Sequence, residues 1–156
     1  MRRRTLAFTF AALALLCGIA SASAEDFGTA AEARSMIQRA ITALKANEAD
    51  ALAAFKDQGN EQFHFHDLYV FCINMPDGKF TAQFDPALIG TDVRKLKLGN
   101  DDYGQRIFAT LAEAPEAVIM SVGYNALRPG TTSGPVPKVS FVARVGRQGC
   151  GVGYYR

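Results

Sequence analysis

The first part of the chain has a helical pattern of apolar and polar positions. From Thr29 onward, apolar side chains recur at steps of three and four residues, and charged or amide side chains fill the positions between them. This spacing predicts an amphipathic helix that buries one face. Thr29 followed by Glu32 fits a capping box at the start of this helix, and Asn47 predicts the start of a second, shorter helix that ends before Gly59. The apolar face of the first helix consists of Met36, Ile37, Ala40, Ile41 and Leu44.

The pattern then becomes strand-like. Apolar, β-branched and aromatic residues dominate two runs, residues 64–74 and 79–84, and Pro76-Asp77-Gly78 lies between them. Turn residues between two such runs indicate a β-hairpin.

The remaining chain alternates helix, strand and loop. Residues 102–114 predict a short helix that ends before a proline, and residues 118–124 predict a third strand. A loop rich in Gly, Pro, Ser and Thr covers residues 125–137, and two further strands follow at residues 138–145 and 149–155. Helices first, then five strands interrupted by one helix, predict an α+β fold with helices packed across the faces of one sheet.

The N-terminal residues change the expected location of the protein. Three arginines, Arg2 to Arg4, precede an apolar run at residues 6–20, and Ala22-Ser23-Ala24 follows it. This arrangement predicts a secretory signal peptide over residues 1–24, and the apolar run is too short to anchor the chain in a bilayer. We therefore expect residues 25–156 to form one domain in the periplasm, without membrane insertion.

Charge and cysteine content narrow the function classes. The formal net charge of +2 falls to about −1 without the three arginines of the leader, which removes the electrostatic case for a nucleic-acid partner. Two cysteines remain beyond the leader, Cys72 and Cys150. An oxidising compartment allows them to pair, and their spacing does not match a zinc or haem motif.

The order of several short motifs resembles one known family. DLYVF, DGKF, DPALIGTD, PVPK and the closing GCGVGYY occur in the order found in single Cache domains, which are extracytoplasmic, PAS-like modules that bind small ligands. The resemblance covers roughly residues 29–156. It implies a PAS/Cache-like antiparallel five-stranded sheet in which the first strand lies beside the last. That neighbourhood would bring Cys72 and Cys150 together as a disulfide.

Four residues are candidates for binding a ligand. Taken alone, Lys138 of PVPK is a solvated charge at the start of a strand, but the resemblance implies a pocket lysine whose natural partner is a carboxylate. Tyr69 and Tyr124 can donate hydroxyl groups to a bound anion or simply pack. The family usually has a histidine where Gln83 stands and a large aromatic residue where Ala126 stands. Glutamine can still donate, whereas alanine removes a wall, which implies either a larger ligand or a degraded pocket.

Glycine repetition marks the last predicted strand. Gly149, Gly151 and Gly153 occupy alternate positions, so one face of this strand has no side chains until Tyr155. Something must approach the backbone closely there, either a packed helix or a ligand.

His64 and His66 supply a competing hypothesis from another function class. They are the only histidines, and an extended backbone would place both imidazoles on one side, a spacing that can chelate zinc or copper. This leaves a metal-dependent hydrolytic enzyme as an alternative, although no third ligand follows at motif spacing and a strand entry with exposed polar side chains explains the pair equally.

The sequence as a whole favours binding without catalysis. We expect a periplasmic, sensor-type domain that binds a small organic anion, needs no cofactor or metal, and acts through a membrane receptor or kinase partner. A structural partner subunit with a vestigial pocket is the third hypothesis.

Overall fold

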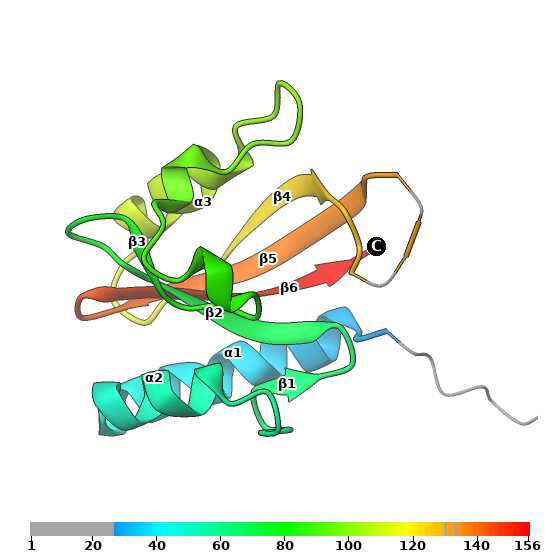
Figure 1. Ribbon diagram of the computed structural model, residues 1–156. Coiled ribbons are helices and arrows are strands. Elements are labelled where there is room, and N and C mark those ends of the chain that lie inside the picture. Colours follow the sequence, from blue (N-terminus) through cyan, green and yellow to red (C-terminus); the bar gives the residue numbers. More distant parts are fainter. Residues whose placement is uncertain (1–26, 130, 133) are drawn as a thin grey trace, which may run out of the picture.

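One antiparallel sheet with helices on both faces forms the centre of the molecule (Figure 1). The computed structural model describes residues 27–129, 131–132 and 134–156, so the predicted signal peptide lies outside the described residues. Helices α1 and α2 lie on one face of the sheet and α3 lies on the other. None of the helices within these described ranges is long and apolar enough to cross a membrane.

The two N-terminal helices begin at the capping residues that the sequence predicted. Helix α1 (Ala30–Ala46) has the full capping box, because Thr29 Oγ1 accepts a bond from the Glu32 amide at 3.2 Å and the Glu32 carboxylate accepts from the Thr29 amide at 2.8 Å. Helix α2 (Glu48–Lys56) begins at Asn47, whose side chain caps its first turn. Caps of this kind satisfy amides that have no partner inside the helix. The buried residues of α1 are Ala33, Met36, Ile37, Ala40 and Leu44.

All strand pairings in the sheet are antiparallel. The strand order is β1-β2-β6-β5-β4. Strand β3 also pairs with β2, at the C-terminal half of β2, whereas β1 pairs with its first residues. The first long strand therefore lies beside the last, as the resemblance implied. Between β3 and β4 the chain forms two short 3-10 helices, η1 (Pro86–Leu88) and η2 (Val93–Lys95), and then helix α3 (Tyr103–Glu113). The strands are β1 (His64–Phe65), β2 (Leu68–Asn74), β3 (Lys79–Ala82), β4 (Met120–Ala126), β5 (Val136–Val145) and β6 (Gln148–Tyr155).

The strand predicted over residues 64–74 is in fact two strands. Phe65 pairs with Leu68, so His66 and Asp67 form a two-residue turn between β1 and β2. His66 has φ 54°, a conformation that usually requires glycine. The prediction of one extended segment was therefore wrong, and the sheet gains the short strand β1 beyond the five predicted strands.

Strand β4 is displaced along the chain from its predicted position. It runs over Met120–Ala126, not residues 118–124, because the chain turns at Ala117, which has φ 59° and donates its amide to the Arg144 carbonyl at 2.7 Å. The loop after β4 accordingly begins at Leu127.

Alternation along the strands divides the core into two layers. On β2, Val70 and Cys72 pack with α1, whereas Phe71 and Ile73 pack with α3. Cys72 lies directly opposite Cys150 on β6, with a Cα–Cα distance of 4.0 Å, and the two form a disulfide within the α1-side core. The predicted disulfide is therefore present in the structure.

Candidate functional site

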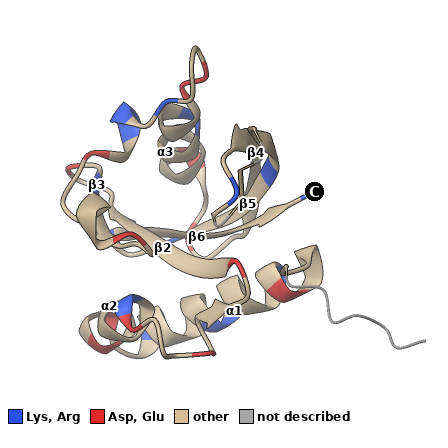
Figure 2. Cartoon of the chain, turned by 45° about the vertical axis from the view of Figure 1, so that its right-hand side comes forward, with Lys and Arg blue, Asp and Glu red and all other residues tan. Residues whose placement is uncertain are grey.

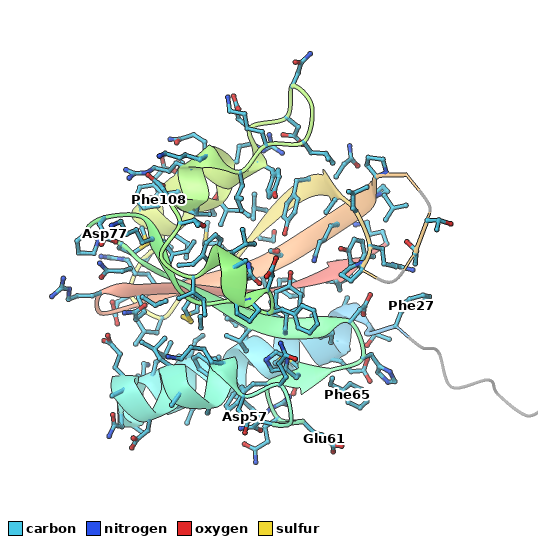
Figure 3. The ribbon with its side chains drawn as sticks, in the orientation of Figure 1. Phe27, Asp57, Glu61, Phe65, Asp77 and Phe108 are labelled. Atoms are coloured by element: carbon cyan, nitrogen blue, oxygen red, sulfur yellow. A yellow bond between two sulfur atoms is a disulfide. The ribbon has the colours of Figure 1, made fainter. Side chains whose placement is uncertain are left out.

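A cavity of about 310 Å³ lies on the α3 side of the sheet, under the segment that connects β3 to α3. Figure 3 shows how densely side chains from the sheet, α3 and the connecting segments fill the space between these elements. The cavity has an apolar part and a polar end. Its apolar lining includes Phe71, Phe80, Leu88, Leu96 and Ile107. Its polar end is formed by Tyr69, Gln83, Tyr124, Lys138 and Tyr155, so the structure brings all four predicted ligand-binding residues together.

Lys138 is the charged group at the polar end. The residue is 5% exposed, and its Nζ donates to the Tyr155 hydroxyl at 3.3 Å. Nζ also lies 4.4 Å from the centroid of the Tyr155 ring and 5.3 Å from that of Tyr69. Among the side chains that the structure describes, no carboxylate forms an ion pair with it. A buried ammonium held by hydroxyl and ring contacts alone is poorly compensated for the water it has lost.

The electrostatics of Lys138 follow from this burial. Desolvation lowers the pKa of Lys138 to about 8, the Asp67 carboxylate acts in the raising direction, and the Arg128 guanidinium lowers it further. The side chain therefore remains mainly protonated at neutral pH, and an anion beside it would favour that form.

The glycines of β6 leave room for these side chains. A Cβ atom at Gly153 would lie 2.5 Å from Cε of Lys138 and 2.8 Å from Oγ of Ser140, so any side chain there would displace these neighbours. At Gly149 the nearest helix atoms belong to Leu111 of α3. One expected cause of the glycine pattern, helix packing, is therefore found at Gly149. At Gly153 the close approach comes from Ser140 and from Lys138, which lines the cavity. Strand β6 itself carries no charged residue, and the cation comes from β5 (Figure 2).

Several tyrosines line the cavity together with Lys138. Tyr124 and Ser140 share a hydrogen bond of 2.8 Å, and the Tyr124 ring stacks on Tyr103 with centroids 5.1 Å apart. Tyr155 donates its hydroxyl to the Leu127 carbonyl at 2.7 Å. Burial raises the pKa of Tyr69, Tyr124 and Tyr155, to about 12 for Tyr155, so these hydroxyls remain neutral donors over the physiological range.

Two positions depart from the pattern of the resemblance, and both line the cavity. The Gln83 side-chain oxygen accepts from the Phe84 amide at 2.7 Å, which leaves the amide nitrogen as its free donor. Ala126 ends β4 at the cavity with only a methyl group.

Tyr155 was missed as a candidate by sequence reasoning. It lies directly opposite Lys138 in the β5–β6 register, on the face that the glycines leave open. The signal was available, because alternation places Tyr155 on the same face as Gly149, Gly151 and Gly153. No comparable pattern in the sequence indicates that Tyr103 on α3 lines the cavity.

The two histidines are not arranged as the sequence suggested. His66 lies in the turn, so it does not share one strand face with His64. His64 Nε2 is 2.9 Å from the Phe55 carbonyl oxygen, and because a carbonyl only accepts, this nitrogen carries a proton and cannot ligate a metal in this arrangement. Within the described ranges, no group of three or more His, Cys, Asp or Glu residues could hold a metal ion.

Comparison with solved structures identifies the fold. No protein-family model matches the chain, and neither does any curated protein sequence. A methyl-accepting chemotaxis protein from Vibrio parahaemolyticus RIMD 2210633 superposes with a TM-score of 0.59 at 18% identity, over 80% of this chain and 86% of that one. A periplasmic sensor domain of a chemotaxis protein gives 0.57 at 20% identity, over 79% and 87% of the two chains.

A third solved structure, reported as the structural basis for carboxylic acid recognition by a Cache chemosensory domain, also gives a TM-score of 0.57. It is 19% identical and matches over 80% of this chain and 91% of that one. Identities this low show the fold alone. The chain therefore has the α+β, PAS/Cache-like fold of periplasmic chemosensory domains.

Proposed function

We propose that this protein is a periplasmic, sensor-type domain that binds a small organic anion in the cavity at Lys138 and signals through a membrane receptor or kinase partner. The observation that carries the proposal is the buried Lys138 ammonium, which faces the cavity without a carboxylate partner among the described side chains.

A carboxylate ligand would supply the missing charge. Removing an ammonium from water is costly unless a charged or strongly hydrogen-bonded partner replaces that water. A ligand carboxylate at the polar end would accept from Lys138 Nζ and from the hydroxyls of Tyr69 and Tyr124, and charge-assisted bonds of this kind are the strong ones. The apolar part of the cavity would take the body of the ligand, so the arrangement matches an acid with a carbon skeleton.

The fold and the predicted export signal support the same proposal. One structural neighbour is reported to recognise a carboxylic acid, and the others are chemotaxis sensor proteins. A disulfide in the core fits an oxidising compartment, as does the signal peptide expected at residues 1–24.

Cavity size guides the choice of ligands. A volume of about 310 Å³ lies at the lower end of the range for pockets that enclose drug-sized molecules. Ala126 contributes only a methyl group to the lining, so it leaves space beside it. The screen should therefore contain acetate, pyruvate and succinate together with medium-chain and aromatic acids such as benzoate.

The test is a thermal-shift screen of these acids, followed by calorimetry on those that stabilise the protein. Ligand at a hundred times its Kd should add about 2.7 kcal/mol to the free energy of unfolding. Lys138→Ala should lose most of this gain, whereas Lys45→Ala, on the exposed face of α1, should retain it. If no acid shifts the melting curve, or if Lys138→Ala binds as tightly as the parent, the anion site is wrong and the partner subunit with a vestigial pocket takes its place.

A further inference from the structure

A second pair of buried charges lies beside the polar end of the cavity. Asp67, in the turn between β1 and β2, and Arg128, in the loop after β4, approach each other with Nε and Oδ2 3.8 Å apart. Their side chains are 9% and 19% exposed, respectively. Asp67 Oδ1 accepts from the Gly28 amide at 2.7 Å, but neither Oδ2 nor Arg128 Nε has a hydrogen-bond partner in the described structure. Two largely buried, oppositely charged groups are thus held near each other without completing a hydrogen bond.

Aromatic rings fix the position of Arg128. Its guanidinium carbon lies 3.9 Å from the ring centroid of Phe27, which Figure 3 labels on the segment that precedes α1, and 4.7 Å from that of Tyr155. Tyr155 is also the ring and the hydroxyl that Lys138 contacts. Tyr155 therefore contacts two cationic side chains. It also donates a hydrogen bond to the Leu127 carbonyl, which lies in the loop that holds Arg128.

The three charges act on one another through this arrangement. Burial disfavours the charged form of Lys138. The Asp67 carboxylate favours that form and the Arg128 guanidinium disfavours it, so both members of the pair act on Lys138 electrostatically. If Asp67 were unpaired, its negative charge would attract the Lys138 ammonium and repel an incoming anion. With Arg128 present, the negative charge is compensated and the three groups together carry one positive charge.

We propose that Arg128 is a positioning residue for the anion site, because its ion pair with Asp67 prevents that carboxylate from neutralising Lys138 and so keeps the ammonium available for a ligand. The inference rests on the proposed function. It adds that the affinity of the cavity is set by a residue that does not line it, and that Asp67 and Arg128 act on a bound anion in opposite directions.

The test uses three charge-removing variants, Arg128→Gln, Asp67→Asn and the double variant, with acetate and benzoate as calorimetric probes at pH 6, where Lys138 stays protonated. Arg128→Gln should weaken binding at least about fivefold, in the range of ordinary coupling between sites. Asp67→Asn keeps the oxygen that accepts from Gly28 and should tighten binding. The double variant should return close to the parent affinity. A purely structural pair would behave differently, because breaking it from either side would weaken binding in both single variants.

A second measurement does not depend on any ligand. The pKa of Lys138, followed by NMR of labelled lysine, should rise in Arg128→Gln and fall in Asp67→Asn. The titratable and charged groups that act on Lys138 or line the cavity with it are Asp67, Arg128, Tyr69, Lys97, Tyr103, Tyr124 and Tyr155. A shallower pocket beside it is lined by Lys138 together with Asp101, Arg106 and Arg156. The tyrosines remain neutral over this titration because burial raises their pKa.

The two measurements separate the two proposals. If neither probe binds the parent but the pKa of Lys138 moves as stated, the proposed ligand class fails, and only the opposing electrostatic effects of Asp67 and Arg128 on Lys138 stand. If the parent binds a probe, equal affinity in Arg128→Gln or weaker binding in Asp67→Asn overturns the inference. Arg128→Lys, which keeps the charge, should retain parent affinity, and its loss would assign the effect to packing on Phe27 and Tyr155. Should Arg128→Gln fail to fold, the tighter binding of Asp67→Asn still decides the question.

Discussion

The burial of Lys138 predicts that the unliganded protein becomes more stable as the pH rises above about 8. Desolvation lowers the pKa of Lys138 in the folded state to about 8 from its ordinary value of 10.5. Between these two pH values the folded protein has released the proton while the unfolded chain still holds it. Stability rises with pH wherever the unfolded state binds more protons, so the free energy of unfolding should increase over this window. Below about pH 8 the cost of the buried charge is present in full.

The magnitude follows from the gap between the two pKa values. At about 1.4 kcal/mol per pH unit, the gap corresponds to an upper limit of about 3 kcal/mol. Solvent screening reduces this little, since Lys138 is only 5% exposed. Lys138→Met, which replaces the ammonium by an apolar chain of similar length, should therefore be more stable than the parent at pH 7 by up to about 3 kcal/mol. This advantage should shrink as the pH approaches 10.

Urea unfolding of both proteins at pH 7, 8, 9 and 10 measures the effect. Burial raises the pKa of Tyr69, Tyr124 and Tyr155, so the unfolded chain ionises these groups first and stability falls near and above pH 10 in both proteins. Only the difference between the two proteins reports on Lys138. Lys45→Met on the exposed face of α1 serves as the control and should show no trend. A stability difference that stays constant from pH 7 to 10, or a Met variant less stable than the parent at pH 7, would refute the reasoning.

Three further outcomes are expected from other parts of the structure. Reducing the Cys72–Cys150 disulfide, which joins residues 78 positions apart, should cost about 4–5 kcal/mol in the chain-entropy model and lower the Tm; an unchanged Tm would contradict this. His66→Gly should stabilise the protein by about 1 kcal/mol in urea unfolding, because glycine adopts φ 54° without strain; a destabilised variant would show that the contact of the imidazole with the Phe65 ring outweighs this strain. Gly153→Ala should cost about 1–3 kcal/mol and weaken acid binding, since its Cβ would clash with the stem of Lys138; parent-like calorimetry would argue against close packing of Lys138 on β6.

Local signals in the sequence predicted the elements that local interactions determine. Thr29 and Asn47 begin helices because their side chains cap the next turn, and that chemistry can be read within four residues. The histidine interpretation failed for the opposite reason. A two-residue turn at His66 with positive φ, but without glycine, leaves no turn signal in the sequence, so the run was interpreted as one strand.

The candidate site depended on information that pattern alone does not contain. The residues around Lys138 predict a solvated charge at the start of a strand, and only the resemblance to Cache domains indicated that Lys138 lines a pocket. Its burial results from β6, since Gly153 provides the space for its stem and Tyr155 receives its Nζ. The pairing of Asp67 with Arg128 joins a turn near the start of the sheet to a loop near its end, a contact that no local pattern predicts.

The bare backbone at Gly153 also affects how the cavity can change during evolution. Because the stem of Lys138 packs on the bare backbone here, a single base change from a glycine to an alanine codon adds a methyl group that displaces this stem. The β5–β6 hydrogen bonds do not depend on that methyl group. Enlarging a wall already filled by a phenylalanine or leucine requires the surrounding side chains to repack. Mutation at Gly153 can therefore shift the cation at the polar end of the cavity in one step, whereas reshaping the cavity elsewhere takes several coordinated steps.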